Sequence, residues 1–355
     1  MPGLADLGNV LNTVRELDIN AIRDESERPV LIACVGDPRL VAQLDHVLTT
    51  APAQGPRALG INPLVGYDLP LKVPPDELRR ADMLLVVIDG RRPPSGAVSD
   101  SLQRLDLLAL PTLLVILFAD ALPSTGARMV LSAASSRTIF LPDPQAPAAA
   151  ELLAKPLLDR LPGELHLAVA RRLPAVRSIY AQNLIGNVSF SNASYAFASG
   201  LPEQVPLLNI PFAAADLVVL TKNQALMVYR IALAHGAVAD FQARMREVLP
   251  VIGGAFLWRQ VARSLIGLIP VWGMVPKVTV AYAGTYSTGI AALRWFAAGE
   301  RIPTEQLRQV SQEALAQGRE WATKLLDQAR AQSGKATSGV GSLVETVRKR
   351  MPGQR

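Results

Sequence analysis

The residues with the most evident potential for chemistry follow an apolar run, Val30 to Val35, that has the character of a buried strand. The run ends at Gly36, and a helical pattern begins two residues later. A strand, a sharp turn at a glycine and a helix form the setting of a phosphate-binding loop, G-x-x-x-x-G-K-[ST]. Its backbone amides hold phosphates, its lysine reaches the outer phosphates and its hydroxyl holds Mg²⁺. The first function to consider is therefore phosphoryl transfer from a nucleotide.

This loop lacks most of the residues that the pattern requires. Gly36 matches the first glycine. The second glycine, the lysine and the hydroxyl residue are replaced by Val41, Ala42 and Gln43. Asp37 also adds a negative charge where phosphates would lie. We therefore expect neither neutralisation of phosphate charge nor ligation of Mg²⁺ in this loop, and phosphoryl transfer depends on both.

The positions of the other GTPase motifs are altered as well. In the segment GYDLPLK, Asp68 matches the aspartate of Asp-Thr-Pro-Gly, but Leu71 replaces the glycine that senses the γ-phosphate. Where Asn-Lys-x-Asp would read guanine, Phe118 and Ala119 are apolar and Asp120 is out of register. The sequence therefore predicts no catalytic residue, no cofactor, no metal site and no GTP hydrolysis. A nucleotide-binding switch with an altered pocket is kept as a minor alternative.

Two stretches of the chain resemble known families. Residues 76–123, which include ADMLLVVIDG and PTLLVILFAD, resemble the middle of an Era-like bacterial GTPase domain in hydrophobic pattern, in Ala81-Asp82 and in Asp89-Gly90. Residues 173–298 resemble the uncharacterised helical domain found C-terminal to such GTPases in bacteria and cyanobacteria. The pieces LTKNQ at 220–224 and AYAGTY at 281–286 carry this second similarity. The resemblance implies a degenerate GTPase domain followed by an often membrane-associated helical domain, and it implies no reaction.

The elements that would position these residues alternate between short apolar runs and helical stretches. The pattern predicts strands at Val30–Val35, Met83–Ile88, Thr112–Phe118 and Arg137–Leu141, and helices at 38–49, 75–81, 97–109 and 145–160. Continuous apolar strands are buried on both faces, as in a parallel sheet flanked by helices. The expected fold is therefore a degenerate, P-loop GTPase-like α/β domain with a parallel sheet, followed by a mostly α-helical C-terminal domain.

The predicted domains follow from changes in this pattern. They are an N-terminal amphipathic helix at 1–28, the α/β domain at 29–160, an apolar, basic helical domain at 161–300, a long amphipathic helix at 301–330 and a flexible basic tail at 331–355. The N-terminal helix could pack on the next domain or lie on a membrane surface.

Charge and cysteine content restrict the compartment and the partners. The single cysteine, Cys34, allows neither an internal disulfide nor a thiolate metal site, and acidic residues near the N-terminus argue against a signal peptide. Residues 1–160 carry 15 Lys and Arg against 19 Asp and Glu, a net charge of −4, whereas the remainder, with 21 against 11, carries +10. A basic, apolar half points to an anionic membrane surface or an acidic partner. Nucleic acid is not expected, because no aromatic-and-basic motif accompanies the scattered arginines.

Three windows in the helical half approach the length of a membrane span, which is about 20 mostly apolar residues. They are residues 210–235, 250–275 and 278–293. Arg259 and Arg263 lie inside the second window, and each central arginine costs about 2.5–3.5 kcal/mol on insertion scales. The candidate contacts with a membrane or a partner are Arg259, Arg263, Lys277, Arg294 and Arg301. The polar residues Thr221, Asn223 and Gln224 are expected to form a helix-packing network, with a ligand site as the alternative.

The leading hypothesis is a non-catalytic scaffold or regulator at the inner face of the cell membrane. Its degenerate GTPase domain would be an interaction module, and its helical domain would attach it to a membrane surface or to a protein partner such as an active GTPase. An integral membrane protein with a hairpin at 250–298 and a cytosolic regulatory domain is the main alternative. The sequence does not predict the oligomeric state.

Overall fold

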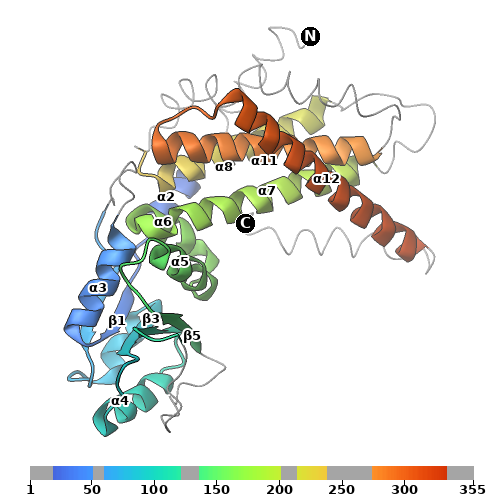
Figure 1. Cartoon of the computed structure of the whole chain (residues 1–355). Helices are drawn as coiled ribbons and strands as arrows, with labels where there is room; N and C mark the ends of the chain where they lie inside the picture. The colour runs from blue at the N-terminus through green and yellow to red at the C-terminus, as the bar shows by residue number, and fades with distance from the viewer. Residues whose placement is uncertain (1–18, 51–59, 121–135, 201–213, 238–273, 334–355) are drawn as a thin grey trace. The chain divides into compact units, whose positions relative to one another are not determined.

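The computed structural model describes residues 19–50, 60–120, 136–200, 214–237 and 274–333 (Figure 1). Its contacts divide the chain into two compact units. The first, here called the sheet unit, comprises Arg23–Tyr180 and Leu233–Gly236. The remaining described residues form the helical unit. Residues 161–180 thus belong with the sheet, whereas the sequence pattern predicts that the helical domain begins at residue 161.

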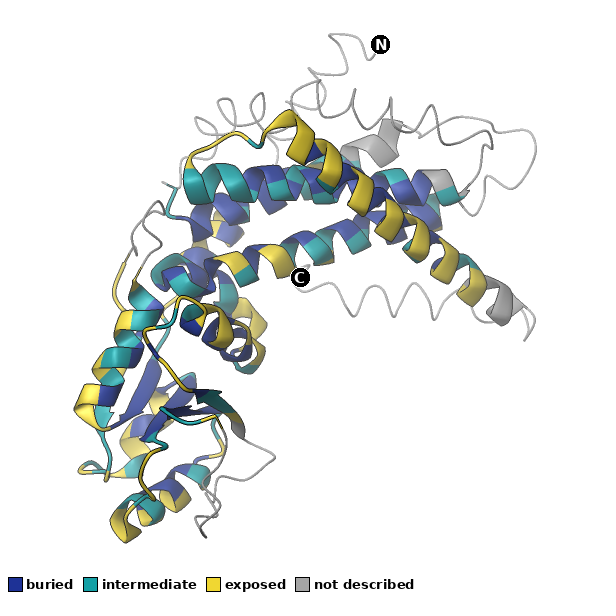
Figure 2. Ribbon diagram, viewed as in Figure 1, coloured by how far each residue is buried: buried dark blue, intermediate teal, exposed yellow. Residues whose placement is uncertain are grey.

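The sheet unit contains a five-stranded parallel sheet, which confirms the predicted α/β fold class. Its strands are β1 (Ile32–Gly36), β2 (Leu64–Asp68), β3 (Met83–Asp89), β4 (Thr112–Leu117) and β5 (Ser136–Leu141). The order across the sheet is β2-β1-β3-β4-β5, and every neighbouring pair is parallel. The strands β1, β3 and β4 are buried almost throughout because helices cover both faces (Figure 2).

The strand β2 was not predicted, and its environment explains why. It lies at one edge of the sheet and pairs with β1 alone. Its sequence, LVGYD, has a glycine at the centre, and Val65 is 38% exposed. A half-exposed strand of five residues lacks the continuous apolar run that marks the buried strands.

Helices pack on both faces of the sheet. On one face, η1 (Pro75–Arg80) and α4 (Gly96–Asp106) contribute Leu78, Leu102 and Leu105 to a core shared with β1, β3 and β4. On the other face lie α3 (Pro38–Thr49) and α5 (Ala149–Arg160), which bury leucines against the strands.

Two of the predicted helices differ in detail. The segment predicted at 75–81 is a short 3₁₀ helix. The helix expected from residue 145 begins at Ala149, because a turn precedes it in which Asp143 Oδ1 accepts the N–H of Gln145 at 2.8 Å.

Short helices complete the sheet unit, and three arginines bind their ends. The helices are α2 (Asn20–Glu27), η2 (Gly163–Leu165), α6 (His166–Arg172) and η3 (Pro174–Val176), followed by the first residues of α7 (Arg177–Gly200). We call Arg171, Arg172 and Arg177 the arginine cluster.

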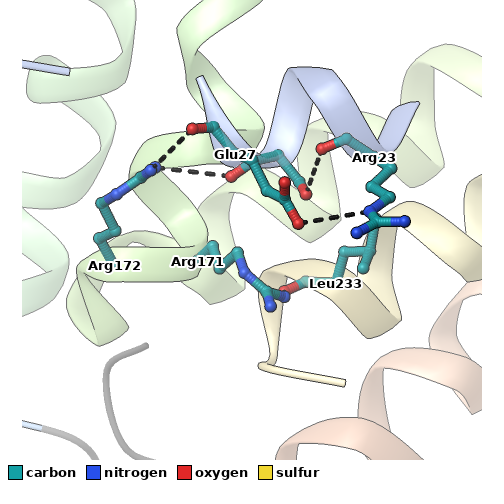
Figure 3. A network of polar contacts seen from close by, with 6 residues as sticks. Arg23, Glu27, Arg171, Arg172 and Leu233 are labelled. Carbon is teal, nitrogen blue, oxygen red and sulfur yellow. Dashed lines mark hydrogen bonds and ion pairs between the residues drawn. The ribbon is translucent and has the colours of Figure 1, made fainter. Parts of the chain in front are cut away.

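Each member of the arginine cluster donates to backbone carbonyls, and Figure 3 shows the contacts of Arg171 and Arg172. Arg171 Nη1 donates to the carbonyl of Leu233 at 2.9 Å. Arg172 donates to the carbonyls of Ala168 at 2.8 Å and Glu27 at 3.2 Å. Arg177, only 4% exposed, donates to the carbonyls of Ala170 and Arg171, both at 3.1 Å. The carbonyls of Glu27, Ala170 and Arg171 lie in the last turns of α2 and α6, where helix carbonyls lack a partner within the helix, so Arg172 and Arg177 satisfy them.

The helical unit is built on α7, α8 (Ala214–Ala234), α11 (Met274–Ala298) and α12 (Thr304–Ser333). The helices α11 and α12 pack closely because Gly318 has no side chain: a Cβ there would lie 3.0 Å from the carbonyl oxygen of Thr279. The long amphipathic helix predicted at 301–330 corresponds to α12: Leu307, Ala314 and Leu325 are buried, whereas most of the residues whose burial is described in this helix are exposed (Figure 2).

Several predicted elements lie partly or wholly outside the described residues. Of the N-terminal helix, only α2 is described, and the tail after Ser333 is not. The predicted hairpin at 250–298 is described only in its second part, α11. Within the described residues, no helix combines the length and the apolar character that a membrane crossing requires.

The arginine cluster leads to a first prediction. Replacing Arg177 with Met keeps an apolar stem of similar length but leaves the carbonyls of Ala170 and Arg171 without that donor. The free energy of unfolding should fall by about 1.5–3 kcal/mol, as for other hydrogen bonds to charged groups. The control is Arg79→Met, because Arg79 is exposed and pairs only with Asp76 within the described structure; its change should stay below about 1 kcal/mol. Urea unfolding followed by circular dichroism measures the free energy of unfolding of both variants. Equal losses in the two variants would contradict the stabilising role of Arg177.

Candidate functional site

The topology of the sheet places its usual ligand site at one edge. In a sheet with the order 2-1-3-4-5, ligands bind beyond the carboxyl ends of the strands where the order reverses, between β1 and β3. Gly36 ends β1 and Asp89 ends β3 at this point. Asp68 ends β2, and Phe118 follows β4. The altered motif residues, which come from separate parts of the sequence, therefore share this carboxyl edge.

The amino end of α3 is occupied by the protein's own groups. Asp37 is the N-cap, and its Oδ1 accepts the N–H of Arg39 at 2.8 Å, while its carbonyl accepts the N–H of Val41 at 2.9 Å. Pro38, the first helical residue, has no N–H to offer. In a phosphate-binding loop, such amides and the positive end of the helix dipole face the anion. Here the Asp37 carboxylate already accepts one of these amides, that of Arg39, and its negative charge would repel a phosphate.

The replaced motif residues lie on α3 and carry no positive charge. Ala42 is exposed, and Val41 and Gln43 are half-buried. The Oε1 atom of Gln43 is buried and has no hydrogen-bond partner. No side chain among the three could take the place of the phosphate-binding lysine or of the Mg²⁺-binding hydroxyl.

Gly36, which matches the first glycine of a phosphate-binding loop, and Gly90, which is part of the resemblance to a GTPase domain, have packing roles. A Cβ on Gly36 would lie 2.8 Å from the carbonyl oxygen of Val87, on the neighbouring strand β3. A Cβ on Gly90 would lie 2.9 Å from the carbonyl oxygen of Leu117, which accepts the N–H of Gly90 at 2.8 Å. Only glycine fits these close approaches between backbones, so neither residue needs a nucleotide to account for it.

Asp89 is held by an arginine from its own turn. Its carboxylate accepts the backbone N–H of Arg91 at 3.0 Å and both Nε and Nη2 of the same guanidinium, at 2.9 and 2.8 Å. These hydrogen bonds lower the pKa of Asp89. The guanidinium carbon of Arg91 also lies 4.1 Å from the centre of the Phe118 ring, within the range of a cation–π interaction. The expected guanine-reading position thus packs against an internal ion pair.

The segment after β2 is fastened to the rest of the unit. The N–H of Leu69 donates to the carbonyl of Gly36 at 3.0 Å, and the N–H of Leu71 donates to Ser101 Oγ on α4 at 3.1 Å. Both leucine side chains pack against the core, and Asp68 pairs with Lys72. A glycine at position 71 would leave this segment free of the apolar contact that Leu71 makes.

The carboxyl edge is therefore acidic and internally bonded. Asp37, Asp68, Asp89 and Asp120 all lie at strand ends or in the turns after them. Within the described residues, no group of three or more His, Cys, Asp or Glu side chains is arranged to hold a metal ion. The edge can repel phosphates and interact with cationic groups, and its described residues provide no set that would transfer a phosphoryl group.

A cavity of about 350 Å³ lies beside this edge, between α3 and β2. Its lining residues are Cys34, Pro38, Val41, Ala42, Asp45, Leu64, Gly66, Tyr67 and Asp68. Cys34 is 2% exposed, as the sequence predicted for a buried thiol. Burial, with a smaller effect of Asp45, raises the pKa of Cys34 to about 12, so the thiol is neutral and unreactive at physiological pH.

Asp45, Gly66 and Cys34 lie on three different elements, so no single segment of the sequence connects them. The sequence feature that could have indicated the cavity is Gly66, a glycine between apolar and aromatic residues in the segment LVGYD. It could indicate a close approach of another backbone or an open groove, and only the strand order distinguishes these.

In the helical unit, two of the three predicted polar residues belong to a buried network. Asn223 Nδ2 donates to Asn192 Oδ1 at 2.7 Å, and Gln224 Nε2 donates to Thr285 Oγ1 at 3.1 Å. Asn192 also donates to Thr285 Oγ1 at 2.9 Å, so the network joins α7, α8 and α11. Thr221 is half-buried and has no hydrogen bond among those described for this network. The arrangement matches a helix-packing network, with Asn192 and Thr285 as members that the sequence analysis missed.

The five basic residues proposed as membrane or partner contacts do not form one described surface. Arg259 and Arg263 lie outside the described residues. Lys277 is 8% exposed and therefore buried within the helical unit. Arg294 is half-buried, hydrogen-bonds to Gln306 and lies 3.9 Å from Glu300, whereas Arg301 is exposed.

Comparisons with known proteins provide no further assignment. No family model matches the chain, and no similar sequence was found among curated proteins.

The packing role of Gly36 leads to a second prediction. Gly36→Ala should lower the free energy of unfolding by about 1–3 kcal/mol, because the added methyl meets a backbone oxygen that has little room to move. Gly96→Ala is the matched control, since no atom lies within 4 Å of a Cβ placed there, and it should be neutral or slightly stabilising. Urea unfolding of the two variants measures the difference. If Gly36→Ala is as stable as the parent protein, the glycine does not serve this packing.

Proposed function

We propose that the protein is a non-catalytic scaffold or regulator. Its sheet unit is a degenerate nucleotide-binding fold that acts as an interaction module. Its helical unit connects that module to a membrane surface or to a protein partner, such as an active GTPase. The basic half of the sequence, with its net charge of +10, is the basis for expecting an anionic membrane or an acidic partner.

The single observation that carries the non-catalytic assignment is the amino end of α3. The Asp37 carboxylate accepts an amide at the position where phosphate would bind, Pro38 removes another donor, and Ala42 replaces the lysine. Electrostatic stabilisation of transferring phosphoryl groups is the main contribution of such sites. An acidic loop without lysine or Mg²⁺ ligand provides none of it.

The alternative is an integral membrane protein with an inserted hairpin at 250–298. It predicts a different result when membranes that contain the protein are washed. An integral protein stays in the membrane pellet after a high-salt or carbonate wash, whereas a peripheral protein is released. The wash therefore separates the two forms of attachment, and retention in the pellet would favour the integral alternative.

The non-catalytic assignment leads to a prediction about nucleotides. GTP and ATP with Mg²⁺ should raise the melting temperature by less than 1 °C or so, and hydrolysis should not exceed background, because ligand binding to the native state would stabilise it by mass action. Differential scanning fluorimetry and a phosphate-release assay measure these quantities. A shift of several degrees with GTP and Mg²⁺ that a chelator abolishes would instead support a nucleotide-binding switch.

Membrane attachment leads to a prediction about liposomes. The protein should bind vesicles containing anionic lipid better than neutral vesicles, and the double variant Arg259→Glu/Arg263→Glu should weaken this binding more than tenfold, since each basic residue near an anionic surface contributes about 1 kcal/mol. Binding of a peripheral protein should also fall at 1 M salt, where the Debye length is about 3 Å.

The matched control for the liposome experiment is Arg79→Glu/Lys155→Glu, which makes the same change in net charge at exposed positions of the sheet unit. Co-sedimentation of both variants with vesicles gives the comparison. Equal, weak partitioning into anionic and neutral vesicles would exclude a membrane role and leave a protein partner.

A further inference from the structure

The outer edge of β2 presents backbone groups that the sheet does not use. In the parallel pair with β1, the N–H of Ile32 donates to the carbonyl of Pro63 and the N–H of Leu69 donates to the carbonyl of Gly36. Odd-numbered residues of this segment therefore bond to β1, and Leu64, Gly66 and Asp68 direct their N–H and C=O groups away from it. The N–H of Leu64 is satisfied by Asn62 Oδ1 at 3.0 Å. Gly66, which is exposed, offers both a donor and an acceptor.

The cavity of about 350 Å³ runs along this same edge, and we call it the α3–β2 groove. One wall is a face of α3 formed by Pro38, Val41, Ala42 and Asp45, which recur at helical spacing. The other wall is β2, where Leu64, Gly66 and Asp68 face α3. Because Gly66 has no side chain, it leaves a small hollow in the middle of the groove: a Cβ there would be in van der Waals contact with Val41 Cγ1, at 3.4 Å, and would have no other neighbour within 4 Å among the described residues.

The two ends of the groove carry carboxylates. Asp45 lies at the end where β2 begins, since its Oδ1 accepts Nδ2 of Asn62 at 2.8 Å. Asp68 lies at the other end and pairs with Lys72, whose side chain is 78% exposed. An exposed ion pair of this kind is worth little, so another cation can displace Lys72. The chemistry at both ends therefore favours a ligand with positive charges.

We propose that the α3–β2 groove binds an extended peptide segment of a partner protein, which adds to the edge of β2 as a sixth strand. The segment carries basic residues at positions i and i+4 and a small apolar residue at i+2. The basic side chains reach Asp45 and Asp68, and the apolar side chain fills the hollow over Gly66. The inference rests on the proposed function, because it names the surface through which the interaction module works.

The geometry of a strand agrees with this spacing. Alternate residues of an extended chain point to the same side, and residues i and i+4 lie about 13 Å apart. Leu64 and Asp68, at the two ends of β2, are also four residues apart. Strand addition of this type obtains affinity from backbone hydrogen bonds and specificity from alternate side chains. A nucleotide would use neither the open backbone groups nor the two carboxylates, which repel its phosphates.

The test uses the full-length protein and fluorescent peptides. The probe is acetyl-TKTVTKT-amide, and the comparison peptides are TETVTET and a version of the probe with N-methylated backbone amides. Fluorescence anisotropy should show saturable binding of the probe at least about tenfold tighter than that of either comparison peptide. The first lacks charge complementarity and the second lacks the backbone donors.

Variants of the protein then locate the binding site. Asp45→Asn/Asp68→Asn should remove the preference for lysine over glutamate, whereas the matched control Asp76→Asn/Asp100→Asn, which changes exposed carboxylates on η1 and α4, should retain it. Gly66→Val fills the hollow and should abolish binding. Ala42→Arg, at an exposed position of α3, should weaken binding at least tenfold, and it provides a second variant if Gly66→Val proves unstable in urea.

Three results would overturn the proposal. The first is an absence of saturable binding to the lysine probe, and the second is binding that Gly66→Val and Ala42→Arg both leave unchanged. The third is self-association in sedimentation velocity that Ala42→Arg abolishes, because the occupant of the groove is then a second copy of this chain. Failure of the peptide to bind leaves the non-catalytic assignment intact, whereas binding of GTP with Mg²⁺ would overturn that assignment separately.

Discussion

The guanidinium groups of Arg171, Arg172 and Arg177 hold the sheet unit together at the ends of its helices. The last carbonyls of a helix have no intrahelical partner and carry the negative end of the helix dipole. A guanidinium has five donors and can satisfy several such carbonyls at once. Arg172 thereby reaches the carbonyl of Ser26, 146 positions away in the sequence. Burial and the nearby Arg171 lower the pKa of Arg177 only to about 10, so the group remains charged at neutral pH.

At the carboxyl edge of the sheet, hydrogen bonds within the protein use groups that would contact a ligand in a nucleotide-binding fold. Asp37 accepts the N–H of Arg39, and Ser101 accepts the N–H of Leu71. A nucleotide-binding fold would leave such positions to phosphates and to loops that respond to them. A nucleotide bound at this edge would have to displace these hydrogen bonds. This cost, together with the acidic side chains, is our reason for proposing a scaffold and not a nucleotide-dependent switch.

Unlike the carboxyl edge, the outer edge of the sheet at β2 has backbone groups that no strand of the sheet uses. Its outward backbone groups at Gly66 are exposed, and a hollow lies beside them. Unpaired strand edges tend to acquire another strand, and natural proteins protect those that must stay free. The acidic ends of the α3–β2 groove limit which chains can approach. Our proposal therefore places the binding function of this unit beside the sheet, whereas the family resemblance implied a site beyond its carboxyl ends.

The sequence alone determined the fold class, because buried strands such as Met83–Asp89 and Thr112–Leu117 are continuous apolar runs that report burial directly. It also showed that positions 41–43 hold no glycine, lysine or hydroxyl residue, which is why no phosphoryl transfer is predicted there. The resemblance to a GTPase domain stays a prediction. The tertiary structure alone decided where the half-exposed strand β2 lies and that Gly66 faces Val41 across a hollow. It also decided that Asn192 and Thr285 complete the network of Asn223 and Gln224. These features depend on strand order and helix packing, which join residues far apart in the chain and leave no periodic signal within any one segment.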